Sequence, residues 1–266
     1  METPAKIYET RGRAREYSEL ALNIYRGCAH QCAYCYSPSV LRMDKKEWET
    51  TPKPRVTLES IEKQAWALYG RRERRPVLLC FTTDPYQPIE AELKLTRNVI
   101  GILHDYLVPV IILTKAGKLA QRDFDLLRPG DQFATTLTFV FEEESKACEP
   151  GAGLPQERKD NLKAAHDLGI ETWVSCEPVI SPVQTRLLIK QTRDYVDHYK
   201  IGKLNYHPRA KQINWRDFAG SLLQLQRDVQ RPFYIKKDLA AHCGRKEGFW
   251  FGCTPTHKGE DDGVDR

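Results

Sequence analysis

Three cysteines lie close together near the start of the chain, in the segment Arg26-Gly-Cys-Ala-His-Gln-Cys-Ala-Tyr-Cys-Tyr36. Their spacing is C-x3-C-x2-C, which places three thiolates on one short loop. Three thiolates can hold a cubane iron–sulfur cluster and leave its fourth iron without a protein ligand. Such an open iron suits a chelating cofactor that carries the difficult chemistry while the protein orients it. The spacing therefore predicts a [4Fe–4S] cluster bound by Cys28, Cys32 and Cys35.

Two other interpretations of these cysteines remain open. Structural zinc takes four ligands, so a fourth would have to come from His30 inside the loop or from His207, Cys243 or Cys253. Alternatively, the three residues are ordinary buried thiols, since free cysteine packs as a small apolar residue. The position of the motif, directly after the first predicted strand, favours the cluster.

The composition is that of one sizeable globular unit. The chain has 266 residues, of which 41% are hydrophobic, and its formal net charge is +5. This charge permits a polyanionic partner without requiring one. The sequence contains neither an apolar run long enough to span a membrane nor an N-terminal signal peptide, so we expect a cytoplasmic protein that does not bind membranes. In that reducing compartment the eight cysteines are expected to be thiols or metal ligands.

Apolar runs alternate with amphipathic stretches along the chain. The expected strands cover residues 21–25, 76–83, 107–113, 132–139, 170–175, 198–203 and 233–235. The expected helices cover residues 58–69, 93–106, 118–127, 156–168, 184–197 and 215–229, and residues 142–155 are expected to form a loop. Strands that alternate with helices build parallel sheets. About six such units predict an α/β fold, a partial (β/α)6 barrel of the TIM type with outer helices.

The expected organisation has three parts. Residues 1–19 form an N-terminal extension, residues 20–240 form the partial barrel, and residues 241–266 form a C-terminal extension with a disordered tail. In barrels of this type the active site lies at the carboxyl ends of the strands. Polar residues follow the expected strands at these ends: Thr82, Thr83, Asp84, Lys115, Thr136, Thr138, Glu177 and Asn205.

The residues around the cysteines resemble a known family. The segment from Leu22 to Pro38, with the aromatic Tyr34 before the last cysteine, is similar to the spore photoproduct lyase-like branch of the radical S-adenosylmethionine (SAM) superfamily. A second block, Thr83-Asp-Pro-Tyr-Gln-Pro-Ile-Glu90, also resembles that branch, and the similarity extends over roughly residues 10–235. The resemblance implies a partial barrel, a [4Fe–4S] cluster and SAM, which the reduced cluster cleaves to a 5′-deoxyadenosyl radical.

The resemblance also assigns roles to several strand-end residues. Lys115 would pair with the carboxylate of SAM, although a surface lysine is the alternative. Thr136 and Thr138 point to the same side of their strand, because side chains alternate. Their hydroxyls would hold the ribose or the carboxylate of SAM, unless the threonines are there only as good strand formers.

Five further residues are expected to surround SAM. Asp84 lies in a turn stiffened by two prolines, and with Thr82 it would orient SAM or the substrate. Glu177 would accept hydrogen bonds from the ribose or from the substrate. The rings of Tyr34 and Tyr36 would border the adenine. For each of them, ordinary packing or a simple connection is the alternative.

One cysteine outside the motif is a candidate hydrogen-atom donor. Spore photoproduct lyases use a cysteine near this part of the chain to return a hydrogen atom to the product radical, and Cys80 is the nearest counterpart. Cys80 is nonetheless flanked by apolar neighbours, and a buried cysteine often serves only as a small hydrophobe. Cys176 is a weaker candidate, and Cys148 is expected to be an incidental loop thiol. Cys243 and Cys253 are too few to bind an auxiliary cluster alone.

The substrate is harder to infer than the cofactor. The basic run 71–75 is expected at the amino-terminal side of the barrel, whereas the arginines in residues 11–15 would contact phosphate near the cluster. By family analogy we expect repair or modification of a nucleic-acid base. The alternatives are modification of a peptide or small molecule, and a metal-stabilised binding protein without turnover. The expected partners are a nucleic acid, a reductant such as flavodoxin or ferredoxin, and possible recognition by a second protein.

Overall fold

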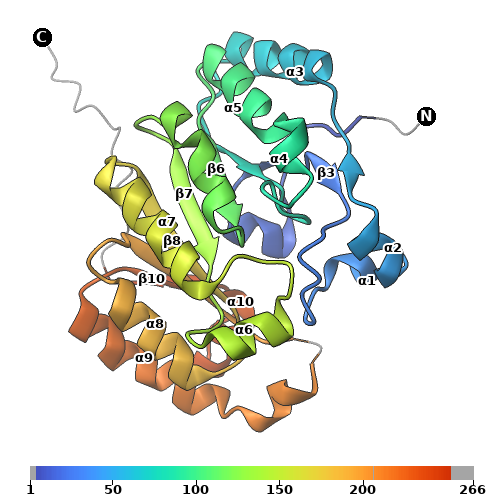
Figure 1. Ribbon diagram of the computed structural model, residues 1–266. Coiled ribbons are helices and arrows are strands. Elements are labelled where there is room, and N and C mark those ends of the chain that lie inside the picture. Colours follow the sequence, from blue (N-terminus) through green and yellow to red (C-terminus); the bar gives the residue numbers. More distant parts are fainter. Residues whose placement is uncertain (1–3, 206, 253–266) are drawn as a thin grey trace, which may run out of the picture.

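A nine-stranded sheet with the strand order β1-β2-β5-β6-β7-β8-β9-β10-β11 forms the centre of the molecule (Figure 1). The structure is a computed structural model that describes residues 4–205 and 207–252. Strands from β2 to β10 run parallel, and β1 and β11 pair antiparallel at the two edges. The strands are β1 (Tyr8–Glu9), β2 (Leu20–Leu22), β5 (Val77–Leu79), β6 (Val110–Thr114), β7 (Gln132–Thr136), β8 (Glu171–Val179), β9 (His198–Lys203), β10 (Phe233–Ile235) and β11 (Phe249–Phe251).

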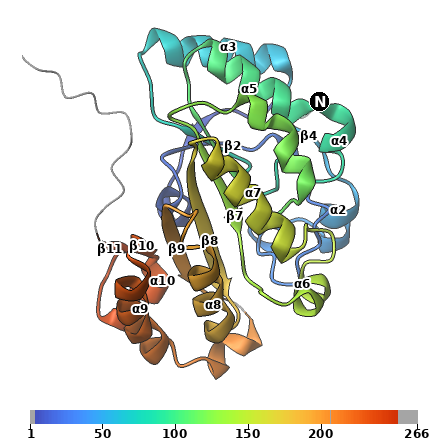
Figure 2. The ribbon, with the colours of Figure 1, turned by 60° about the vertical axis from the view of Figure 1, so that its left-hand side comes forward.

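Six helical segments connect the parallel strands, so the described part of the chain contains six strand–helix units and a seventh parallel strand. They are α3 (Leu58–Gly70), α5 (Leu95–Asp105), the 3-10 segment η2 (Lys118–Leu126), α7 (Pro155–Asp167), α8 (Pro182–Thr192) and α9 (Trp215–Val229). Figure 2 shows α7, α8 and α9 along strands β8 to β10. The predicted α/β class with a mostly parallel sheet and outer helices is confirmed. None of the helices in the described part of the chain has the length and apolar character needed to cross a membrane.

Alternation along the strands divides the apolar residues between two buried faces. One face packs against the helices and includes Leu22, Leu79, Ile112, Phe133 and Ile201. The other face carries a smaller cluster of Ala21, Leu78, Ile111, Ala134 and Trp173. Because strands of parallel sheets are covered on both sides, they appear as nearly continuous apolar runs in the sequence. We call this second face the inner face of the sheet.

Capping residues set the start of the main helices. The side chain of Thr57 accepts the Ser60 N–H at the start of α3, and Asn214 accepts the Asp217 N–H at the start of α9. Such caps satisfy amide groups that have no partner within the helix. Helix α8 begins earlier than expected, at Pro182, where a proline is tolerated in the first turn.

The prediction that residues 142–155 form a loop is wrong for the first half of that segment. Residues Glu142–Cys148 form the helix α6. Its first turn carries three consecutive glutamates, whose charge favours the amino terminus of a helix. The expected strand 21–25 also divides in two, because β2 ends at Leu22 and β3 begins at Tyr25.

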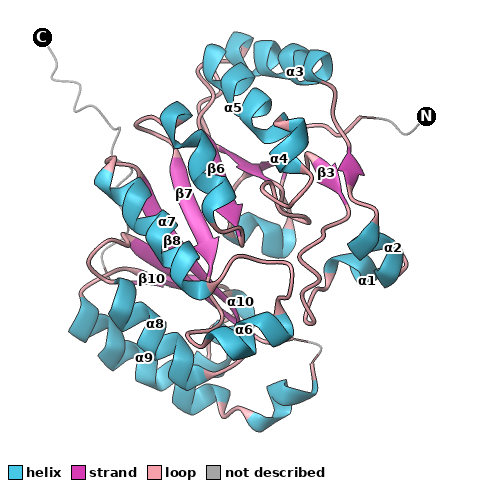
Figure 3. Cartoon of the chain, viewed as in Figure 1, coloured by secondary structure: helices cyan, strands magenta, loops and turns pink. Residues whose placement is uncertain are grey.

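Short elements surround the cysteines and the ends of the strands, and many of them lie next to irregular loops (Figure 3). Strand β3 (Tyr25–Arg26) pairs with β4 (Lys53–Pro54) in a separate two-stranded sheet. The other short elements are η1 (Gly12–Glu16), α1 (Ser37–Val40), α2 (Lys45–Thr50), α4 (Glu90–Leu93), η3 (Pro208–Gln212), α10 (Lys237–Ala240) and η4 (Ala241–Cys243).

The N-terminal segment η1 reaches from the first strands to the last ones. The Lys200 ammonium donates hydrogen bonds to the carbonyl oxygens of Glu16 and Tyr17, at 3.0 and 2.8 Å. The Glu16 carboxylate accepts the Lys237 N–H at 2.7 Å, and Arg13 forms an ion pair with Asp238 at 2.8 Å. The predicted N-terminal extension is therefore tied to the strands on the far side of the sheet.

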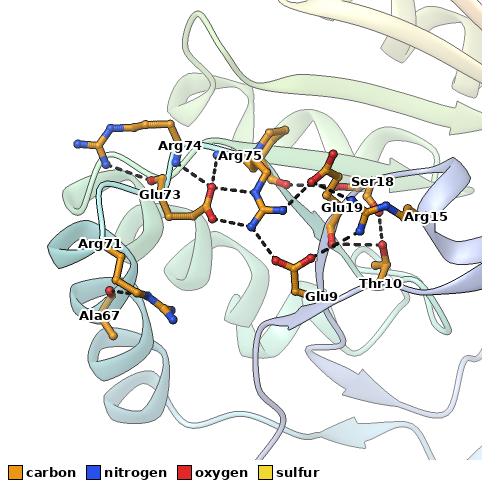
Figure 4. A network of polar contacts seen from close by, with 11 residues as sticks. Glu9, Thr10, Arg15, Ser18, Glu19, Ala67, Arg71, Glu73, Arg74 and Arg75 are labelled. Atoms are coloured by element: carbon orange, nitrogen blue, oxygen red, sulfur yellow. Dashed lines mark hydrogen bonds and ion pairs between the residues drawn. The ribbon is translucent and has the colours of Figure 1, made fainter.

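An ion-pair network lies at the amino-terminal side of the strands (Figure 4). Arg75, which precedes β5, contacts the carboxylates of Glu9, Glu19 and Glu73 at 2.6–2.7 Å. Arg15 contacts Glu9 and Glu19 as well. The basic run 71–75 lies where it was predicted. Arg15 was expected to contact phosphate near the cysteines, but its ion pairs hold it at this opposite end of the strands.

Candidate active site

The cysteine loop joins β3 to α1, and α2 packs against it. Gly27 has a φ angle of +82°, and a Cβ there would lie 2.8 Å from the Trp48 carbonyl oxygen. The same carbonyl accepts the Cys28 N–H at 2.9 Å, and the Cys35 N–H donates to the Cys32 carbonyl at 3.0 Å. Only glycine adopts this conformation readily at such a close approach, so Gly27 allows α2 to brace the loop.

Gln87 clamps the same loop from the proline-rich turn after β5. Its side-chain oxygen accepts the Ala29 N–H at 3.0 Å, and its side-chain nitrogen donates to the Gly27 carbonyl at 3.1 Å. Gln87 is fully buried, so these two bonds satisfy polar groups that have no access to water. The turn that was singled out in the sequence therefore positions the cysteine loop directly.

Asp84 connects the cysteine loop with the end of β6. Its carboxylate accepts hydrogen bonds from the Thr114 hydroxyl and the Lys115 N–H, each at 2.7 Å, and from the Tyr86 N–H at 2.9 Å. The His30 ring lies 3.4 Å from the same carboxylate. Burial would raise the pKa of Asp84, but His30 and the hydrogen bonds outweigh it and lower that pKa to about 2. Asp84 is thus ionised and bound to protein groups, and any effect on SAM would pass through them.

Lys115 lies at the end of β6 as predicted, close to the cysteine loop. Its ammonium is 5.8 Å from the centre of the Tyr34 ring. Burial would lower the pKa of Lys115, yet the neighbouring Cys32, Glu149 and Asp84 raise it above its usual value. Lys115 therefore carries a positive charge at neutral pH, which a carboxylate ligand requires.

A buried ion pair beside Lys115 was not predicted from the sequence. Arg158 of α7 donates to the Glu149 carboxylate at 2.6 Å, and both side chains are almost completely buried. The Tyr34 hydroxyl donates to the same carboxylate. Burial would raise the pKa of Glu149, and the charges of Arg158 and Lys115 reverse this and lower it. The pair fixes the tyrosine of the cysteine motif next to the strand ends.

The last residue of α6 and the residues that follow it also form hydrogen bonds with the cysteine loop. The Ala33 N–H donates to the Cys148 carbonyl at 2.8 Å, and the Gly151 N–H donates to the His30 carbonyl at 3.1 Å. Cys148 was expected to be an incidental thiol, yet its backbone is part of this support. No residue pattern indicates this support, because the contacts are made by backbone atoms.

The two predicted threonines contact Tyr34 and Arg158. Both side chains are buried. The Thr138 hydroxyl is 3.5 Å from the Tyr34 hydroxyl, and the Thr136 carbonyl accepts an Arg158 N–H at 2.9 Å. Thr82, by contrast, is hydrogen-bonded through its N–H and its hydroxyl to the Asn23 side chain, at 2.9 and 3.1 Å.

Glu177 is the centre of a second polar cluster, on the inner side of β8. The Tyr17 hydroxyl and the Lys236 ammonium both donate to its carboxylate. The Lys236 ammonium also lies 3.6 Å from the centre of the Tyr17 ring. Burial and the Glu177 charge raise the pKa of Tyr17, and burial together with Tyr17 and Glu177 raises that of Tyr36. Tyr36 therefore extends this cluster to the cysteine loop, because it follows Cys35 directly.

Cys80 and Cys176 are the two candidate hydrogen-atom donors outside the cysteine motif. Both are buried in the core that packs against the helices, on the face of the sheet opposite to Ala21 and Trp173. Burial raises the pKa of each thiol to about 12. Cys80 directly follows β5 and has a φ angle of 62°, so the alternation of the strand does not extend to its side chain. Its role as a hydrogen-atom donor stays a prediction. Cys243 is exposed, and Cys253 lies outside the described residues.

The cysteine loop fits a cluster with three thiolate ligands. The seven described cysteines are all free. Burial raises the pKa of Cys28 and Cys32, and the neighbouring thiols add to this for Cys28, so metal binding would have to displace protons. Within residues 4–205 and 207–252, no three His, Cys, Asp or Glu side chains converge around a single ion. A cubane places each thiolate on a different iron, so its ligands need not converge in this way.

A cavity of about 370 Å³ lies elsewhere, at the amino-terminal side of the strands. Gln132, Glu171 and His198, the first residues of β7, β8 and β9, line it together with the segment 15–19. The cavity is therefore at the opposite end of the strands from Glu177 and Lys115. We assign the chemistry to the carboxyl ends of the strands, where these two residues lie.

Comparisons with known proteins found similar sequences and similar folds. The model of the radical SAM superfamily matches residues 22–196. An uncharacterized protein of Methanocaldococcus jannaschii is 26% identical over 192 residues, which cover 71% of each chain. An uncharacterized protein of Mycobacterium tuberculosis is 32% identical over 171 residues, or 60% of this chain and 49% of the relative.

Two solved folds are similar to this one. Spore photoproduct lyase with bound SAM and dinucleoside spore photoproduct has a TM-score of 0.62 at 15% identity, over 78% of this chain and 62% of the lyase. Streptococcus suis SuiB bound to its precursor peptide SuiA has a TM-score of 0.64 at 11% identity, over 87% of this chain and 53% of SuiB. The chain thus spans about three fifths of the lyase and about half of SuiB.

Proposed function

This chain belongs to the radical SAM superfamily, and on that basis we propose that it repairs or modifies a base of a nucleic acid. It is an enzyme that uses a [4Fe–4S] cluster and SAM, as members of this superfamily do. When bound, these groups supply a 5′-deoxyadenosyl radical.

Cys28, Cys32 and Cys35 are the cluster ligands in this proposal. The observation that carries it is the bracing of their loop by Gln87 and by the pair of Asp84 with His30, with the cationic Lys115 close to Cys32. This arrangement holds three thiols in place before any metal binds, and it keeps a positive charge beside them.

Other residues hold SAM and the substrate. Lys115 binds the SAM carboxylate, and Thr136, Thr138 and Tyr34 border the cofactor on the same side. Glu177 accepts a hydrogen bond from the ribose or from the substrate, and Tyr36 lies between it and the cysteines. Asp84 and Thr82 have a positioning task, which their hydrogen bonds support.

The nucleic-acid substrate is supported by the fold similarity to spore photoproduct lyase, a structure of which holds a dinucleoside lesion, and by the net charge of +5. The fold similarity to SuiB bound to a precursor peptide favours a second candidate, a peptide substrate. The free thiols fit a reducing compartment, so we place the enzyme in the cytoplasm.

Anaerobic reconstitution tests the chemistry. Protein supplied with iron, sulfide, SAM and dithionite should turn brown and release 5′-deoxyadenosine. Cys32→Ala should abolish both, whereas Cys80→Ala and Cys148→Ala should retain both. A colourless protein that holds zinc instead would point to a binding protein without turnover.

The substrate is tested by product analysis. The reduced enzyme is incubated with SAM and damaged or intact DNA, RNA or a peptide mixture, and products are identified by mass spectrometry. Gel shifts with single- and double-stranded DNA at two salt concentrations accompany this, since phosphate contacts weaken steeply with salt. No shift at low salt, together with a modified peptide, would reject the nucleic-acid substrate.

A further inference from the structure

An exposed apolar patch lies directly after the cysteine motif. Val40 and Leu41, at the end of α1, have 68% and 42% of their surface exposed. Exposed apolar residues that occur together, rather than singly, are typical of places where another protein docks. These two follow Cys35 by five and six residues in the sequence, which keeps the patch close to the cysteine loop.

Basic residues surround this patch. Arg42, Lys45 and Lys46 are all exposed. Residues 39–55 contain five basic and three acidic side chains. Asp44 caps α2 by accepting the Glu47 N–H at 2.9 Å, and Glu49 pairs with Lys45 at 3.7 Å, so basic side chains exceed acidic ones by two in this segment. We call Val40, Leu41, Arg42, Lys45 and Lys46 the α1–α2 surface.

A hydrogen bond connects helix α2, which carries part of this surface, with a proposed cluster ligand. The carbonyl of Trp48, in α2, accepts the Cys28 N–H at 2.9 Å. Trp48 is buried beneath the surface, and its carbonyl also lies against Gly27. In Figure 1, α1 and α2 lie together at the edge of the molecule, with no other labelled helix outside them. A protein docked here would therefore lie close to the cysteine loop, because the backbone of α2 contacts that loop directly.

We infer that the α1–α2 surface docks an acidic one-electron carrier protein, of the flavin or iron–sulfur class, that reduces the cluster. This inference rests on the proposed cluster at Cys28, Cys32 and Cys35. One electron passes from the reduced carrier to the oxidised cluster, so the carrier is oxidised by one electron and the cluster reduced by one, and no atom or proton is transferred. The basic side chains steer an acidic partner, and the apolar pair excludes water at the centre of the contact.

Charge reversal at this surface is the decisive test. Lys45→Glu/Lys46→Glu should slow reduction of the cluster by reduced flavodoxin, measured by stopped-flow absorbance, about tenfold or more at low salt, and the effect should shrink at high salt. Reduction by dithionite, followed by release of 5′-deoxyadenosine, should be unchanged. Lys63→Glu is the matched control, because Lys63 is also exposed and pairs with a glutamate four residues away on α3. It should behave like the unchanged protein with both reductants.

Binding gives a second readout that does not depend on turnover. Calorimetry of oxidised flavodoxin with the reconstituted protein should show weaker binding for Lys45→Glu/Lys46→Glu, and for Val40→Ser, than for the unchanged protein and Lys63→Glu. Equal losses in the control, or no loss at Lys45 and Lys46, would overturn the inference. A Lys45→Glu/Lys46→Glu protein that loses affinity for DNA but keeps its affinity for flavodoxin would also overturn the inference. If dithionite also fails in the unchanged protein, the proposed function fails, and calorimetry still decides the docking.

Discussion

Gly202 of β9 lies against the carboxyl group of Glu177 on β8. A Cβ at position 202 would be 2.5 Å from the carboxyl carbon, which is closer than atoms approach without one of them moving. The missing side chain of Gly202 thus makes the space in which Glu177 meets Tyr17 and Lys236. A substitution at Gly202 can therefore move the Glu177 carboxylate without changing the fold as a whole.

Gly202→Ala should displace the Glu177 carboxylate from its partners while the protein still folds. Gly202 has no positive φ angle, so alanine is compatible with the backbone, and the carboxylate is the group that moves. We expect a melting temperature within a few degrees of the original, together with weaker SAM binding and slower release of 5′-deoxyadenosine. Differential scanning fluorimetry and calorimetry with SAM measure the two effects.

Gly220→Ala serves as the control for that experiment. Gly220 lies within α9, and a Cβ there would have no heavy atom within 4 Å. Alanine in place of glycine inside a helix stabilises by about 1 kcal/mol. This variant should therefore keep SAM binding and melt slightly higher. Normal SAM affinity in Gly202→Ala would show that the place of Glu177 does not matter for the cofactor.

Breaking the buried pair of Glu149 and Arg158 should cost much stability. Glu149→Gln or Arg158→Met leaves one buried charge without its partner, which typically costs about 3–5 kcal/mol. The double variant should lose less than the sum of the two single ones, because neither charge then remains alone. Urea denaturation measures all three. Simple additivity would mean that the two side chains act independently despite their 2.6 Å contact.

Gln87→Met should impair assembly of the cluster more than it impairs folding. Methionine has a similar shape but leaves the Ala29 N–H and the Gly27 carbonyl without their buried partners. Each unsatisfied group costs about 1–3 kcal/mol, and the loop would escape this by shifting. Iron and sulfide per chain after reconstitution should fall. The exposed Gln224→Met is the comparison, and an equal cluster content in both variants would exclude a clamp at Gln87.

The lowered pKa of Lys200 should make the stability of the protein rise as the pH increases above neutral. Burial lowers the pKa of Lys200 to about 7, and the nearby charge of Lys236 adds to this, while Glu171 and Glu16 oppose it. A lysine in the unfolded chain keeps its proton up to about pH 10.4, so the unfolded state binds more protons between these values and stability rises with pH. Lys200→Met should flatten this rise between pH 7 and about 10 in thermal melts. An identical slope in both proteins would contradict the shifted pKa.

The sequence contains local signals for the cysteine loop and for most of the strand ends. The cysteine spacing lies within one loop, and the alternation of side chains along a strand is enough to group Thr136 with Ala134 on the inner face. Lys115 could be placed because a buried apolar run precedes it. In each case the pattern extends over fewer than ten residues, so no knowledge of distant contacts is needed.

The remaining site residues depend on contacts between distant segments. Tyr17 and Glu177 are 160 residues apart, and nothing near either one indicates the other. Arg158 appears in the sequence as one charge among several on a polar helix, and only the fold buries it against Glu149. Alternation would place Cys80 on the face of Leu78, but its φ angle of 62°, directly after β5, accompanies a place in the other core cluster.

The two short antiparallel strands β1 and β11 have a consequence for self-association. They cover the outer backbone groups of β2 and β10, the first and last strands of the parallel sheet. A chain trimmed of residues 4–9 or 249–252 would expose a row of unpaired amides and carbonyls along an apolar strand, the kind of edge at which protein chains add to one another. Shortened versions of this protein should therefore oligomerise and precipitate as their concentration rises, even where their active site is intact.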